Sequence, residues 1–113
     1  LKIACDELNT ENPVTDMVCY HCQQAVEKIL KAFLVFNNKE ITKTHDIAEL
    51  IIECSDIDKE FEVLFEKDID ALTVYAVEIR YPGDMYMPEI EEAKEAIEKA
   101  KFVKEFVMKK MGG

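Results

Sequence analysis

Residues 14–36 read VTDMVCYHCQQAVEKILKAFLVF, and apolar side chains recur along this stretch at steps of three and four residues. That spacing places them on one face of an α-helix. We therefore predict a central amphipathic helix over residues 14–36. Its apolar face comprises Val18, Cys22, Ala25, Val26, Ile29, Leu30 and Phe33. Its polar positions, which we expect to face elsewhere, include Asp16, Gln23, Glu27 and Lys31.

The flanking residues supply the signals that begin and end a helix. Asn12 and Pro13 fit the N-cap and the first helical position, where asparagine and proline are favoured. Residues 37–39 read NNK, and an asparagine can adopt the left-handed conformation that ends a helix. Residues 1–8 have the apolar spacing of a helix, but no residue caps its start. We expect this first helix to be truncated at its N-terminus.

Two further helical segments are predicted after the central helix. Thr44 is an N-cap candidate for a helix that extends to Cys54. Its buried positions are predicted to be Ile47, Leu50 and Ile51. Ser55 and Asp58 resemble a capping box, which would begin a new helical region at this point. That region carries Phe61, Leu64 and Phe65.

The last part of the chain predicts two more helices separated by a loop. The first covers about residues 68–80, after a kink near residues 66–68. Its inward positions are Ile69, Leu72, Tyr75, Ala76 and Ile79. Pro82 and Gly83 favour a loop over residues 81–87, and Pro88 can restart a helix. The inward face of this last helix is Ile90, Ala93, Ile97, Ala100, Val103 (or Phe102), Phe106 and Val107.

These patterns define an all-α protein, and the simplest arrangement is an up-and-down bundle of four or five helices. The 113 residues suffice for a single hydrophobic core, so we expect residues 1–113 to form a single domain. Apolar residues make up 49% of the chain, with only three glycines and three prolines, which excludes a disordered or turn-rich protein.

The charge and the segment pattern limit the expected location and partners. No apolar stretch is long enough to span a bilayer and no signal-peptide pattern is present, so we expect a cytoplasmic protein with no membrane partner. The four cysteines are then expected to be reduced. A net charge of −10 disfavours non-specific binding to RNA, so any RNA contact would need a local site.

Three segments together resemble the HEPN family, named for a nucleotide-binding domain of higher eukaryotes and prokaryotes. They are CYHCQQAVEKILKAFL at residues 19–34, THDI at residues 44–47, and IRYP at residues 79–82. With the flanking helices they cover nearly the whole chain. The resemblance implies a four- or five-helix bundle, often dimeric, of the kind that accompanies minimal nucleotidyltransferases.

The resemblance also bears on activity. Many HEPN proteins are RNases of toxin–antitoxin pairs that use an arginine and a later histidine with four to six residues between them. Arg80 is present here, but positions 85–87 read MYM, so that histidine is missing. We therefore expect a non-catalytic subunit, and enzyme activity stays uncertain.

The candidate nucleotide-binding residues are Arg80, Tyr81, His45, Gln23 and Lys28. Arg80 could bind a phosphate with its planar guanidinium group, and Tyr81 could stack on a base. Gln23 and Lys28 belong to the HEPN-like segment, where they could line a nucleotide pocket or form ordinary solvated surface. His45 could bind a ligand, or its role could be limited to capping the helix that follows it. No cofactor is assigned, and the candidate ligand is a nucleotide.

Two alternatives stay open beside the accessory subunit. One is an RNase with a non-standard site, in which Arg80 stabilises phosphate charge and His21 or His45 supplies the acid–base group. The other is a purely structural dimerisation module. We predict no metal site, because the Cys19-x-x-Cys22 pair lies within a helix and has no second pair to complete four ligands. The expected partners are a second copy of the chain and a minimal nucleotidyltransferase.

Overall fold

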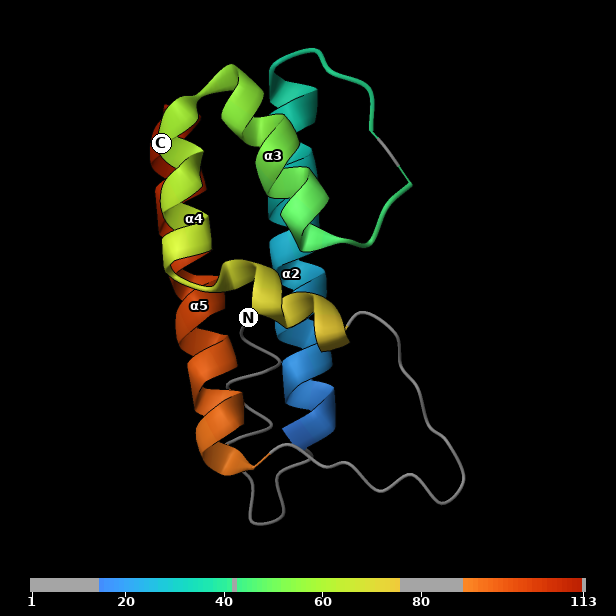
Figure 1. Cartoon of the computed structure of the whole chain (residues 1–113), viewed down its shortest axis with the longest axis vertical. Coiled ribbons are helices and arrows are strands. Elements are labelled where there is room, and N and C mark those ends of the chain that lie inside the picture. The colour runs from blue at the N-terminus through green and yellow to red at the C-terminus, as the bar shows by residue number, and fades with distance from the viewer. Residues whose placement is uncertain (1–14, 42, 76–88, 113) are drawn as a thin grey trace.

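The computed structural model describes residues 15–41, 43–75 and 89–112, and within these ranges all regular secondary structure is helical (Figure 1). The predicted all-α class is confirmed. The central helix, α2, spans Thr15–Phe36 and follows the predicted pattern. Val18, Cys22, Val26, Leu30 and Phe33 are all buried. The predicted first helix lies outside the described residues.

The end of α2 also follows the prediction. Asn38 has a φ of +62°, the left-handed conformation that asparagine tolerates. The amide of Lys39 donates to the carbonyl of Leu34 at 2.8 Å, which satisfies one of the last carbonyls of the helix.

Helix α3 spans Ile47–Ile57, and its ends differ from the prediction. Asp46, and not Thr44, is the N-cap: its carboxylate accepts from the amide of Ala48 at 3.0 Å. Thr44 accepts from the amide of Asp46 at 3.0 Å and so supports the cap from outside the helix. The predicted capping box at Ser55 is wrong, because the hydroxyl of Ser55 donates to the Ile51 carbonyl within α3.

Three short elements follow α3: the 3₁₀ helix η1 (Lys59–Glu62), the α-helix α4 (Val63–Glu66) and the 3₁₀ helix η2 (Ile69–Tyr75). Asp58 alone caps η1 by accepting from the amide of Glu60. The predicted kink is confirmed, because α4 ends at Glu66 and Asp68 has a φ of +56°. Where the predicted helix over residues 68–80 is described, it is 3₁₀, and it buries Ile69 and Leu72 as expected.

Helix α5 spans Ile90–Lys110, and Glu89 takes the N-cap position. Its buried positions include Ala93, Ile97, Ala100, Val103 and Val107, as predicted. Ile90 is an exception, since it is 47% exposed. It is the first residue of α5, and the turn from Ala93 onward is the part that enters the core. Tyr75, Phe102 and Phe106 pack on the core while staying half-buried.

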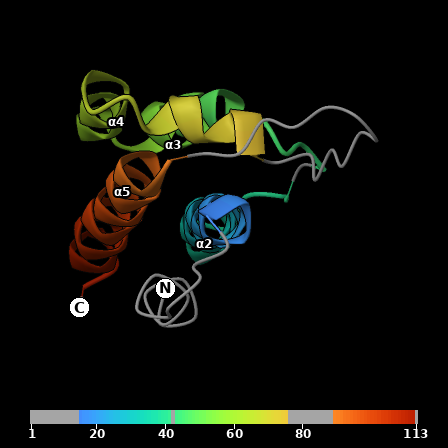
Figure 2. The same ribbon diagram turned by 90° about the horizontal axis from the view of Figure 1, so that it is seen from below.

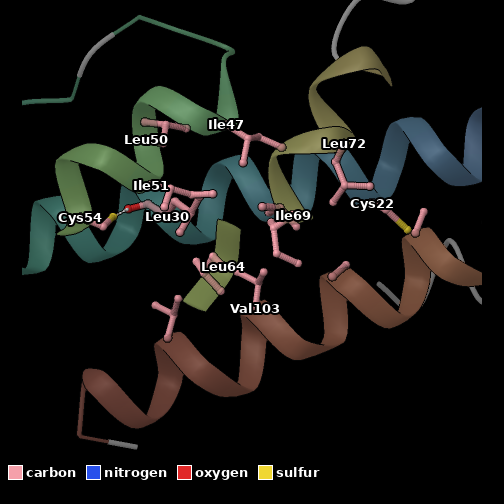
Figure 3. Packing of buried hydrophobic residues seen from close by; sticks show 14 of the residues in the cluster. Cys22, Leu30, Ile47, Leu50, Ile51, Cys54, Leu64, Ile69, Leu72 and Val103 are labelled. Carbon is pink, nitrogen blue, oxygen red and sulfur yellow. Dashed lines mark hydrogen bonds between the residues drawn. The ribbon is translucent and has the colours of Figure 1, made fainter. Parts of the chain in front are cut away.

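The helices form two layers. Helices α2 and α5 make the most extensive contact, and α3, α4 and the 3₁₀ segments lie across them as a second layer (Figure 2). Their buried side chains meet between the layers, where Leu30 of α2, Ile51 of α3 and Val103 of α5 contribute to the same core (Figure 3). No helix among the described residues is long and apolar enough to cross a membrane.

Candidate functional site

Two of the candidate residues meet at Glu27, in the second half of α2. The Glu27 side chain is only 7% exposed, and Gln23, one turn earlier, is fully buried. The prediction that these two side chains face away from the packed side of α2 is therefore wrong. The connection between α2 and α3 places His45 against this side of α2.

Hydrogen bonds join the polar groups into what we call the Glu27 cluster: Gln23, Gln24, Glu27, Lys31 and His45. The amide of Gln23 donates to Glu27 Oε1 at 2.9 Å, and Lys31 Nζ donates to Glu27 Oε2 at 2.8 Å. The amide of Gln24 donates to Gln23 Oε1 at 2.7 Å. Among the described residues, no buried side-chain polar atom lacks a hydrogen-bond partner. These bonds offset the cost of burying the carboxylate.

His45 lies at the outer edge of this cluster, directly before the N-cap of α3. Its Nδ1 is 3.0 Å from both carboxylate oxygens of Glu27, while 68% of its side chain is exposed. A carboxylate on one ring nitrogen fixes the orientation of an imidazole. The second ring nitrogen of His45 is thereby left to bind a ligand from solvent.

The environment of Glu27 favours its charged form. Burial, the largest single influence, raises the pKa of the Glu27 carboxyl. Hydrogen bonds from Lys31, Gln23 and His45, with the charge of Lys31, outweigh burial and hold this pKa below its usual value. Glu27 is therefore an ionised anchor near neutral pH. Its oxygens are already engaged, so it is poorly suited to accept a proton from a substrate.

The other candidate residues do not join the cluster. Lys28 is exposed and lines a neighbouring groove on α2. His21 is half-buried two turns earlier, with its ring 6.0 Å from that of Tyr20. Arg80 and Tyr81 lie outside the described residues. The structure thus brings together Gln23 and His45 of the five nucleotide-binding candidates.

Sequence reasoning missed that Glu27 would be the centre of the site. A signal was present, because Gln23, Glu27 and Lys31 follow one another at four-residue steps and so lie along one stripe of the helix. The contact with His45 joins residues 18 positions apart, and helix periodicity carries no information about it.

The described cysteines form no metal site. Cys19, Cys22 and Cys54 are buried, and the described ranges hold no group of three or more His, Cys, Asp or Glu side chains that could bind a metal ion. Burial, with a smaller contribution from Glu53, raises the pKa of Cys54 to about 12. The Cys54 thiol donates to the carbonyl of Leu30 at 3.7 Å, as Figure 3 shows.

These three thiols are expected to resist alkylation in the folded protein, because the thiolate is the reactive form and all three are buried. Iodoacetamide at mildly alkaline pH should label them at least about tenfold more slowly in native buffer than in urea, as the equilibrium for opening limits access. Peptide mass spectrometry would measure the labelling of each cysteine. Fast native labelling of Cys54 would contradict the structure.

The fold and the cluster together define a helical-bundle domain with a polar cluster and one largely exposed imidazole at the side of its central helix. The chain belongs to the HEPN family: the model of the HEPN domain matches residues 3–111. Comparison with curated proteins and with solved structures gives no match.

Proposed function

We propose that this chain is a nucleotide-binding HEPN subunit that serves a partner enzyme and performs no catalysis of its own. Membership of a family of nucleotide-binding and RNase-type domains supports the ligand class. The observation that carries the proposal is His45: its ring is largely exposed, yet the buried Glu27 carboxylate fixes it in place. A fixed and exposed imidazole pays little entropy on binding a ligand.

The nucleotide would meet His45 together with cationic groups of the chain. The free ring nitrogen can bond to a phosphate oxygen or to a base edge, depending on its protonation. Lys43, two residues earlier, is exposed and adds a positive charge near the same connection. Arg80 would supply a bidentate phosphate contact, as the family resemblance implies. Its family partner histidine is absent, which supports binding over cleavage.

Titration calorimetry with ATP and with AMP tests the site. His45→Ala is expected to weaken nucleotide affinity by about tenfold, the equivalent of losing one good hydrogen bond. His21→Ala is the matched control, because His21 lies on the same helix as Glu27 but outside the cluster. Equal affinities for the wild type and His45→Ala, or no nucleotide binding by the wild type, would exclude His45 as the contact.

The expected setting of this subunit is a homodimer in the cytoplasm, paired with a separately encoded minimal nucleotidyltransferase in a toxin–antitoxin-like system. The net charge of −10 fits a protein that avoids bulk nucleic acid. Light scattering should give the mass of a dimer, and co-expression should yield a complex with the enzyme. If the protein is a monomer and does not form a complex with the enzyme, a purely structural module is the better assignment.

The Glu27–His45 pair gives one specific reason to keep an RNase as second candidate. A buried carboxylate that orients an exposed imidazole is also the arrangement of a general acid–base pair. With Arg80 it would cleave RNA without a metal. Such cleavage must then disappear in both Arg80→Ala and His45→Ala and persist in His21→Ala, whereas a wild type inactive on RNA eliminates this candidate.

A further inference from the structure

An apolar groove runs along the outer face of α2, beside the Glu27 cluster. It has a volume of about 550 Å³. Its apolar lining comprises Ala32, Val35 and Phe36 of α2, Ile41 of the following connection and Met111 after α5. Val35, Phe36 and Ile41 are 49%, 55% and 55% exposed. Three large apolar side chains gathered in one hollow mark a surface that gains free energy when it is covered.

The charge around this groove is opposite to that of the chain as a whole. Lys28 and Lys31 line one part of it, and the connection that carries Ile41 also carries the exposed Lys39 and Lys43. Because Lys31 is paired with Glu27, the count includes Glu27: residues 27–43 contain these four lysines and two glutamates, a formal charge of +2, whereas the chain has −10. A positive rim on an acidic protein favours an acidic occupant.

The shape and lining favour a helix as that occupant. Lys28, Ala32 and Val35 recur at helical steps on α2, so the groove follows the helix axis for about two turns. A second helix laid along it can insert its own apolar side chains between Phe36, Ile41 and Met111. A nucleic acid is less suitable, because the apolar side chains that form most of the lining offer its phosphates no hydrogen-bond donor.

A second copy of the chain also fits poorly. Two grooves facing each other would bring two segments of charge +2 together, which opposes association. The groove of one copy against another surface of the next would be a heterologous contact, which extends into filaments unless the rotation closes a ring. The homodimer proposed above would therefore use a different face.

We propose that this groove docks an amphipathic helix of a partner protein, one whose apolar stripe is bordered by carboxylates that meet Lys28 and its neighbouring lysines. His45 does not line the groove, whereas Lys31 belongs to both the groove and the Glu27 cluster. Substitution of an apolar lining residue is therefore expected to remove docking and to leave nucleotide binding. The apolar stripe supplies affinity, and the lysines select acidic helices over basic ones.

Fluorescence anisotropy with two labelled synthetic peptides tests this docking. Both peptides carry leucines at helical spacing, and glutamates border the leucines in one, lysines in the other. The glutamate peptide is expected to bind at least about tenfold more tightly, with an affinity that falls as salt rises. Lys28→Glu should reduce that preference.

A matched pair of variants locates the binding. Ile41→Ser should weaken binding of the glutamate peptide by about tenfold or more, whereas Ile52→Ser should not. Ile52 has nearly the same exposure, 54% against 55%, but lies on α3 and does not line the groove. Nucleotide affinity measured on the same variants should stay unchanged.

Three results would overturn the proposal. The first is that both peptides bind with equal affinity, or that neither peptide binds. The second is a wild-type oligomer whose mass falls in Ile41→Ser, which would assign the groove to a second copy. The third is an RNA oligonucleotide that binds the wild type and is lost in Ile41→Ser, which would assign it to nucleic acid.

Discussion

Phe61→Ala is expected to lower the free energy of unfolding by about 3–5 kcal/mol, the usual cost of removing a buried phenyl ring. Phe61 is fully buried in η1 and lies between two other rings. Its ring centroid is 4.4 Å from that of Phe33 on α2 and 5.0 Å, edge to face, from that of Phe106 on α5. Without the Phe61 ring, η1 would lose these aromatic contacts with α2 and α5.

Urea unfolding followed by circular dichroism measures this effect. The free energy of unfolding of an ordinary domain is about 5–15 kcal/mol. Phe61→Ala should therefore move the midpoint of unfolding to a much lower urea concentration. Phe36→Ala is the control, because the Phe36 side chain is 55% exposed and its removal should cost within about 0.5 kcal/mol. Similar losses in the two variants would mean that the three-ring packing is not a main support of the fold.

Helix periodicity was enough to predict the apolar faces of the two long helices. Val18, Val26 and Leu30 on α2, with Ala100 and Val103 on α5, are buried where the spacing placed them. For these apolar residues burial follows the sequence directly, because each residue's direction is set by its place in the helical turn.

Prediction failed where two local signals compete or where packing decides. Thr44 and Asp46 are both good N-caps two residues apart, and only the structure shows that Asp46 caps α3 while Thr44 supports it. The segment over residues 69–75 has helical spacing but forms a 3₁₀ helix. Its side chains must fit between α3 and the long helices, a constraint that local propensity does not contain.

The site was predictable in its members but not in its geometry. Gln23 and His45 belong to segments that resemble the HEPN family, so they were candidates from the start. Their meeting point, Glu27, depends on the path of the connection between α2 and α3. Polar residues on a helix are usually solvated, and only the closure of that connection makes Glu27 a buried anchor.

Glu27→Ala is the second large effect, with an expected loss of about 2–3 kcal/mol of unfolding free energy. The variant removes the buried carboxylate that bonds to three side chains, and it leaves the buried amide of Gln23 without its acceptor. Lys31, at 18% exposed, can turn toward solvent, which limits the cost. Glu27→Gln keeps an acceptor and should lose less, about 1–2 kcal/mol. A loss below about 0.5 kcal/mol in Glu27→Ala would contradict a structural role for the cluster.

The difference in unfolding free energy between the wild type and Glu27→Gln should also depend on pH. Because the pKa of Glu27 is lower in the folded chain than in the unfolded chain, its charge stabilises the fold above the unfolded value of about 4.3. That contribution is lost as pH falls through the folded pKa. Unfolding free energies should therefore differ at neutral pH and converge at acidic pH, as Glu27 becomes protonated in the folded chain. Glu98→Gln, at an exposed position of α5, should differ little from the wild type throughout. A difference that grows on acidification would mean that burial, and not the bonds from Lys31, Gln23 and His45, controls the ionisation of Glu27.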